Sequence, residues 1–208
     1  MFYFSKSKYA HFCECPMKIW LEKYKPEECH VDDASRARME AGNEIGDLAM
    51  GYFGDYVEVT SYNGDRIDLT AMIDRTKEEL NKGTSVICEA SFHYNGLFCS
   101  VDILKEENGG WAIYEVKSST DGTKETYIND VAYQKYVLEH CGVKVTGTYV
   151  MCINNQYIYD GNLDIQAFFK ITDVSSMVEE KMPGIEENLN RAQVMLSDDN
   201  EPDRKSVV

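Results

Sequence analysis

The sequence predicts an α/β fold with a central mixed β-sheet flanked by helices and a helical element at the N-terminus. Three observations predict it. Three β-forming runs, SVICEASFHY, LFCSVDILKE and GWAIYEVKSS, follow one another with short turns between them. A helical pattern then leads to another β run, VTGTYVMCIN. The chain is also 43% hydrophobic, which is enough for a substantial core.

The first 83 residues are predicted to be mainly helical. Pro16 interrupts the first helical pattern, so a second helical piece is expected to begin there. Gly83 is expected to end the last helix of this part. The predicted elements are a helix at 5–24, a loop at 25–33, a helix at 34–53, a short strand at 56–60 and a helix at 68–83.

The rest of the chain alternates strands and helices. Gly142 is expected to end the crossover helix that follows the three β runs. The predicted elements are strands at 85–94, 97–106 and 110–119, a helix at 125–141, a strand at 145–154, short β segments near 157–161 and 168–173, and a helix at 174–196.

The chain is acidic, which limits the kinds of partner that it can bind. Its 208 residues carry a formal net charge of −15. This charge counts against a protein that coats nucleic acid through general positive charge. It is compatible with an enzyme that grips a few phosphates through a metal or a local basic patch. No apolar run is long enough for a membrane span, no secretory signal is evident, and the odd number of cysteines indicates reduced thiols, so we expect a cytoplasmic protein.

Two carboxylates and an ammonium group lie close together in the hairpin VDILKEENGGWAIYEVKSST. Side chains alternate along a strand, so Glu115 and Lys117 share a face. A turn centred on Asn108 and Gly109 places Asp102 opposite Glu115, with Cβ atoms about 5 Å apart. Carboxylates at this spacing repel unless a cation lies between them, and Mg²⁺ or Mn²⁺ prefers such oxygens. The spacing therefore predicts a divalent metal site.

A simpler interpretation stays open at this point. Asp, Glu and Lys side chains on a solvated strand face are common, and Lys117 alone would neutralise part of the charge. Two observations count against it. The flanking valines and isoleucines indicate central strands, and Gln134 on the following helix is expected to face the same region.

These motifs resemble the PD-(D/E)XK nuclease superfamily, in particular its RecB-like branch with the CRISPR-associated adaptation exonucleases. The signature is an Asp on one strand, Glu-x-Lys on the next and Gln on the following helix. Here Asp102 stands in VDIL, Glu115 and Lys117 in YEVKSS, and Gln134 in DVAYQKYVLEHCG. The resemblance covers roughly residues 5–155 and implies a restriction-endonuclease-like core.

The resemblance also implies an activity. It is metal-dependent hydrolysis of phosphodiester bonds in DNA, often from an end, with Mg²⁺ or Mn²⁺. Asp102, Glu115 and the main-chain carbonyl of Val116 would bind the metal, Lys117 would orient the nucleophile or stabilise charge, and Gln134 would orient the site or contact DNA. We expect one domain over residues 1–200, with a helical part at 1–55, a catalytic core at 84–155 and a flexible tail at 197–208.

The sequence departs from the family pattern at the early helix. Many RecB-like members carry a metal-binding His there, and Gly46 stands about where that His would be. Glu44 on the same helix and Glu89 on the strand preceding Asp102 are the candidates to replace it. For Glu89, an ordinary exposed strand residue is the competing interpretation.

A second departure concerns an iron–sulfur cluster that many relatives bind. They use one cysteine near the N-terminus and three near the C-terminus. Cys15, just before Pro16, matches the first, but the last cysteine of the chain is Cys152. Such clusters need four ligands. We therefore expect no cluster within this chain: either it is absent or the chain is a fragment that ends before it.

The sequence leaves two other hypotheses open. One is a catalytically silent nuclease fold that serves as a binding or assembly module, favoured by the acidic charge and the missing His. The other is an unrelated α/β protein in which Asp102 and Glu115 do not converge. The expected partner is DNA, single- or double-stranded, and the sequence is also compatible with a protein partner. The sequence does not fix the oligomeric state.

Overall fold

A β-sheet of mixed direction forms the centre of the structure, a computed structural model that describes residues 4–202. The strands are β1 (Phe4–Ser5), β2 (Val57–Glu58), β3 (Tyr62–Asn63), β4 (Arg66–Ile67), β5 (Val86–Tyr94), β6 (Leu97–Glu107), β7 (Gly110–Lys117), β8 (Val145–Ile153) and β9 (Phe169–Asp173). The order is β2-β5-β6-β7-β8-β9, with β1 beside β6; β3 and β4 form a separate hairpin. The meander β5–β6–β7 is antiparallel, and β8 lies parallel to β7.

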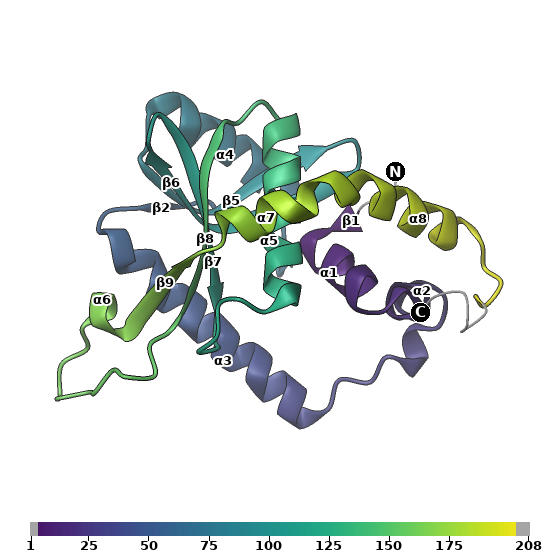
Figure 1. The fold of residues 1–208 in the computed structure, drawn as a ribbon, viewed down its shortest axis with the longest axis horizontal. Coiled ribbons are helices and arrows are strands. Elements are labelled where there is room, and N and C mark those ends of the chain that lie inside the picture. Colours follow the sequence, from purple (N-terminus) through teal and green to yellow (C-terminus); the bar gives the residue numbers. More distant parts are fainter. Residues whose placement is uncertain (1–3, 203–208) are drawn as a thin grey trace.

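Helices cover the sheet, and most of them lie on one side (Figure 1). The helices are α1 (Lys6–Glu14), α2 (Pro16–Tyr24), α3 (Asp33–Met50), α4 (Leu69–Lys82), α5 (Glu125–His140), α6 (Ile165–Phe168), α7 (Ser175–Lys181) and α8 (Ile185–Ser197). Short 3₁₀ turns cover Pro26–Glu28, Gly51–Phe53 and Met182–Gly184. As predicted, Pro16 begins the second helical piece, because proline needs no N–H partner in a first helical turn.

Apolar side chains pack on both faces of the sheet. On one face Ile87, Leu104 and Ile113 pack with α1, α5, α7 and α8. On the other, Ile103 and Tyr114 pack with the end of α3. Strands that are buried on both faces need nearly continuous apolar runs, which β5, β6 and β7 have. The predicted fold class, a central mixed sheet flanked by helices with a helical N-terminal element, is confirmed.

The turn between β6 and β7 has the predicted centre. Asn108 and Gly109 have φ values of 53° and 69°. Both central residues of a type I′ hairpin turn need positive φ, and asparagine and glycine adopt it most readily. The turn joins Glu107 and Gly110, which pair across the hairpin. It therefore sets the register that the site residues depend on.

Two predicted elements are wrong. Residues 174–196 do not form one helix, because Pro183 lacks an N–H and separates α7 from α8. Residues 157–161 form no strand. The Tyr157 N–H donates to the carbonyl of Asn154 over 3.0 Å, and its hydroxyl donates to that of Asn162 over 3.2 Å. The segment thus closes on itself as an exposed loop.

The C-terminal end of the described chain contacts the N-terminal helices. The carbonyl of Asp198 accepts a hydrogen bond from the Trp20 indole N–H over 3.2 Å, and Lys25 pairs with Glu201 over 2.8 Å. Residues 203–208 of the predicted flexible tail lie outside the described residues. Within residues 4–202, no helix combines the length and the apolar character needed to cross a membrane.

Phe4 anchors the start of the described chain, which gives a first prediction. Its side chain is fully buried, and its carbonyl accepts a hydrogen bond from the Tyr133 hydroxyl over 2.6 Å. Replacing a buried Phe by Ala leaves a cavity, so Phe4→Ala should lower the free energy of unfolding by about 3 kcal/mol. Urea denaturation measures this. Val194→Ala is the control, because Val194 is 71% exposed. Equal effects of the two substitutions would contradict the anchoring role.

Candidate active site

The strands β6 and β7 part at the predicted site. Their ladder has the predicted register and stops at the pair Ile103 and Tyr114. Beyond this pair, the Val116 N–H donates to Asp102 Oδ2 over 2.8 Å. The carboxylate of Asp102 thus satisfies a main-chain donor that the ladder leaves free. This arrangement opens a fork between the strands, with Asp102 on one arm and Glu115 on the other.

The neighbouring ladder between β5 and β6 is interrupted at the same level. Glu89 and Asp102 stand opposite each other but are not paired, whereas the residues on both sides are. Glu89 has a φ of 57°, which is uncommon for a residue with a side chain. By the registers of both ladders, Glu89, Asp102 and Glu115 form a row of carboxylates across three adjacent strands.

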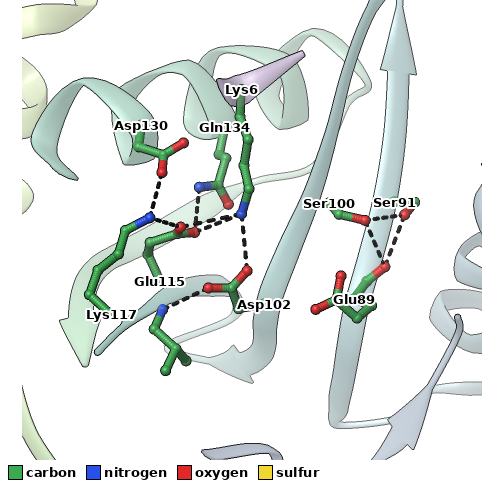
Figure 2. A network of polar contacts seen from close by, with 10 residues as sticks. Lys6, Glu89, Ser91, Ser100, Asp102, Glu115, Lys117, Asp130 and Gln134 are labelled. Carbon is green, nitrogen blue, oxygen red and sulfur yellow. Dashed lines mark hydrogen bonds and ion pairs between the residues drawn. The ribbon is translucent and has the colours of Figure 1, made fainter. Parts of the chain in front are cut away.

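Two serine hydroxyls hold Glu89 in its unusual backbone conformation. The Glu89 carbonyl accepts hydrogen bonds from Ser91 Oγ over 2.9 Å and from Ser100 Oγ over 3.3 Å. The two hydroxyls also contact each other over 2.6 Å (Figure 2). Residues kept in sparsely populated backbone regions cluster at functional sites. The bracing therefore supports Glu89 as a functional residue.

Lys6, which the sequence analysis missed, lies inside the fork. Its Nζ is 3.0 Å from Asp102 Oδ1 and 3.1 Å from Glu115 Oε2. Figure 2 shows the ammonium between the two carboxylates. Burial disfavours the charged amine, but Asp102 and Glu115 outweigh it and raise the pKa of Lys6 well above its usual value. A cation thus lies between the paired carboxylates, and in this structure it is an ammonium.

Glu115 is the most enclosed carboxylate of the site, with its side chain 1% exposed. Besides Lys6, it accepts hydrogen bonds from Lys117 Nζ to Oε1 over 2.6 Å and from Gln134 Nε2 to Oε2 over 2.7 Å. Burial alone would raise its pKa. The two ammonium groups and the amide outweigh burial and hold the pKa of Glu115 well below its usual range. The structure thus brings Glu115, Lys117 and Gln134 into direct contact.

Asp130 is a second residue that the sequence analysis missed. Lys117 Nζ lies 2.8 Å from Asp130 Oδ2, so its ammonium is fixed between Asp130 and Glu115. Burial lowers the pKa of Lys117, but these two carboxylates outweigh it and raise the pKa strongly. Asp130 lies one helical turn before Gln134 on α5, and residues four apart share a helix face. The four-residue spacing from Gln134 was the sequence signal that could have identified Asp130 as a site residue.

Three further carboxylates have raised pKa values because they are buried among like charges. Burial, and then the charge of Asp102, raises the pKa of Glu89 to about 7. Burial, and then the charge of Glu115, raises that of Asp130 to about 6. The pKa of Asp102 is raised by burial and by Glu115, although Lys6 opposes the shift. At each of the three, repulsion from a neighbouring carboxylate therefore adds to the effect of burial.

A cleft of about 390 Å³ opens over this cluster. From α3 it is lined by Gly42, Asn43, Gly46, Asp47 and Met50. Glu44 is exposed and does not line it, so the structure does not bring this candidate ligand to the carboxylates. The residues of α3 that do line the cleft recur at helical spacing, and Glu44 falls outside that stripe. Gly46 does face the cleft. A larger cavity of about 730 Å³, between Phe12 and α8, shares none of the site residues.

The donor set at the fork fits a hard divalent cation. Carboxylate oxygens of Asp102 and Glu115 already converge on one cation, the Lys6 ammonium, and Val116 lines the same cleft. Among residues 4–202, no group of three or more His, Cys, Asp or Glu side chains is arranged as a complete metal cage. Mg²⁺ does not need one, because it commonly keeps several waters beside one or two carboxylates. Asp130 Oδ1 and Gln134 Oε1 are also buried acceptors without a partner in the described part.

This chain has a remote structural likeness to a solved protein. Neither the family models nor the curated proteins contain a match. A solved structure similar to this chain is an alkaline exonuclease, LHK-Exo, from Laribacter hongkongensis. The two chains are 11% identical, and the TM-score is 0.48. The match covers 94% of this chain and 90% of the exonuclease chain. A likeness of this size establishes neither a family nor an activity.

Glu89 gives a prediction for the metal-free protein. Its pKa is raised from 4.5 to about 7, so the folded state binds a proton that the unfolded state has released. The free energy of unfolding should therefore fall as the pH rises from 4.5 to about 7. Glu89→Gln should remove up to about 3 kcal/mol of this fall. Urea denaturation in EDTA at several pH values measures it.

Glu44→Gln is the matched control, because Glu44 is an exposed carboxyl outside the cleft. It should leave the pH dependence of the wild type unchanged. A Glu89→Gln protein whose pH dependence equals that of the wild type would show that Glu89 keeps an ordinary pKa.

Proposed function

We propose that the protein is a metal-dependent deoxyribonuclease that hydrolyses phosphodiester bonds with Mg²⁺ or Mn²⁺. One observation carries this proposal. The carboxylates of Asp102 and Glu115 converge on a single cation, the Lys6 ammonium. Directly beside it, Glu115 and Asp130 hold the ammonium of Lys117 in place. This combination offers metal ligands and a fixed positive charge at one cleft, which phosphoryl transfer requires.

The chain's own residues have distinct roles in this proposal. Asp102, Glu115 and the carbonyl of Val116 would hold the metal, which supplies Lewis acidity and lowers the pKa of bound water. Lys117 stabilises negative charge on the scissile phosphate, because two carboxylates fix its ammonium at the cleft. Gln134 orients Glu115 through the amide hydrogen bond. Water forms the new P–O bond, one ester P–O bond breaks, and the products are a phosphate monoester and a hydroxyl.

DNA as the substrate, and cleavage from an end, are supported by the resemblance of VDIL, YEVKSS and DVAYQK to the RecB-like nucleases. Glu89 is the proposed replacement for the missing metal-binding His. Its carboxylate lines the cleft beside Asp102, and the serine hydroxyls fix its backbone. Lys117 is the residue whose loss should impair cleavage, since its ammonium reaches the cleft.

A specific observation favours a second candidate function, a catalytically silent nuclease fold that binds a partner. Lys6 occupies the space between Asp102 and Glu115 and gives both carboxylates a counterion without any metal. A protein of this kind would keep the fold and the charge balance of the site but cleave nothing. Metal-dependent cleavage distinguishes the two candidates.

The first experiment is cleavage of end-labelled linear DNA, single- and double-stranded, with Mn²⁺, Mg²⁺ or EDTA. The wild type should cleave only with metal. Lys117→Ala should lower the rate by at least about 100-fold, because it removes a fixed positive charge from the site. Covalently closed circular DNA tests whether cleavage starts from an end. An exonuclease needs an end and should leave this substrate intact.

Lys77→Ala is the control, because Lys77 is an exposed lysine on α4 whose side chain is 69% exposed. It should cleave like the wild type. Thermal unfolding establishes that both variants are folded. A folded wild type that cleaves no DNA with either metal would contradict the nuclease proposal and favour the silent module.

Gly46 offers a gain-of-function prediction. It faces the cleft, and a Cβ added there would meet no atom within 4 Å. The backbone therefore has room for a side chain here, and Gly46→His should present an imidazole to the cleft and tighten Mn²⁺ binding by about tenfold. Isothermal titration calorimetry measures the affinity. Gly184→His, at a glycine outside this cleft with equal space, is the control. An unchanged affinity in Gly46→His would contradict the placement of the metal beside α3.

A further inference from the structure

The position of Lys6 is fixed by the backbone. Strand β1 runs parallel to the start of β6, with Phe4 beside Leu97 and Ser5 beside Phe98. Strand β7 pairs with the other end of β6, so β1 takes the side of β6 that β7 has left. Lys6 follows directly as the first residue of α1. Strand β1 therefore fills the fork, and the side chain of Lys6, which follows it, points to Asp102 and Glu115.

Side chains reinforce this placement of the N-terminal segment. The Tyr133 hydroxyl donates to the Phe4 carbonyl over 2.6 Å, and the Ser5 hydroxyl caps α1 by accepting from the Lys8 N–H over 3.4 Å. A lysine at the first turn of a helix is unfavourable to the helix dipole. The carboxylates of the fork compensate for this, and the Lys6 side chain is 19% exposed.

The charge of the cleft shows why a cation is needed there. Its lining carries five carboxylates, of Asp47, Glu89, Asp102, Glu115 and Asp130, and two ammonium groups, of Lys6 and Lys117. When all are ionised, three negative charges are left in excess. Lys117 is engaged by Glu115 and Asp130. Lys6 is thus the ammonium group that the structure pairs with Asp102.

We propose that Lys6 is the resident cation of the site and competes with the divalent metal for Asp102 and Glu115. This inference rests on the metal site of the proposed function. The ammonium contacts Asp102 Oδ1 at 3.0 Å and both carboxylate oxygens of Glu115 at 3.1 and 3.3 Å, and these two carboxylates are the ones that would hold the metal. The ammonium lies between the two carboxylates, so a metal held by both of them would need the space that the ammonium fills.

Displacement requires movement of one side chain only. The backbone of Lys6 is held by β1 and α1, but its four-carbon stem can rotate the ammonium out of the fork into the cleft that Lys6 lines. The site therefore has two states. In one, metal is bound and Lys6 is displaced; in the other, no metal is bound and Lys6 pairs with the carboxylates. The exchange lowers the apparent affinity of the site for metal.

Calorimetric titration with MnCl₂ tests this competition in the wild type, Lys6→Met and Lys8→Met. Methionine keeps the length of the stem and removes the charge. Lys6→Met should bind Mn²⁺ at least about tenfold more tightly than the wild type, because no charged hydrogen bonds must be broken first. Lys8→Met is the control, since Lys8 is exposed on the same helix. An affinity of Lys6→Met equal to or weaker than that of the wild type would overturn the proposal.

A second measurement uses the wild type and does not depend on folding of the variant. An amine-acylating reagent is applied with and without saturating Mn²⁺, and mass spectrometry follows the labelling of Lys6 and Lys8. Lys6 should be protected without metal and become reactive with metal, because its ion pairs are then broken. Lys8 should be labelled equally in both conditions. Labelling of Lys6 that does not change with Mn²⁺ would overturn the proposal.

The failure of this inference is distinguishable from failure of the nuclease proposal. If Lys6→Met binds Mn²⁺ and the wild type neither binds it nor cleaves DNA, the competition stands and the nuclease proposal fails. If the wild type cleaves and both proteins bind Mn²⁺ equally, the nuclease proposal stands and the competition fails. If neither protein binds Mn²⁺, both fail.

Discussion

The buried carboxylate of Glu115 is the constraint on which the site depends. An ionised carboxylate in the interior is costly unless charge and hydrogen bonds compensate for it. Lys6, Lys117 and Gln134 do so here, and they come from three different elements, α1, β7 and α5. Loss of one partner would leave a buried charge only partly compensated, so the three elements are tied to one another through a single side chain.

The parting of β6 and β7 gives this carboxylate its neighbours. A regular ladder would continue past Ile103 and Tyr114, but the Asp102 side chain accepts the Val116 N–H and ends it. The opening admits β1, and with it an ammonium group. The polar cluster and the local irregularity of the sheet are therefore one feature. The apolar packing on both faces of these strands keeps the irregularity confined to the fork.

The part of the site that follows from local rules was predictable from the sequence. Alternation along the strands and the Asn-Gly turn place Asp102 opposite Glu115, and a helix after a strand places Gln134 nearby. Lys6 follows no such rule. It lies 96 residues from Asp102 in the sequence, and a two-residue strand that gives no periodic signal brings it there. Glu44 lies outside the cleft because packing, which no local pattern encodes, sets the rotation of α3 about its axis.

The acidic character of the protein then bears on how DNA would be bound. The chain carries a net charge of −15, and the cleft adds no excess of positive charge to oppose it. A phosphate can approach such a cleft only when bound cations offset its carboxylates. In the proposed nuclease, affinity for DNA and affinity for metal are therefore coupled, and thermodynamic linkage makes the coupling reciprocal. A displaced Lys6 would strengthen this coupling, since its ammonium would then lie in the cleft, where the phosphate approaches.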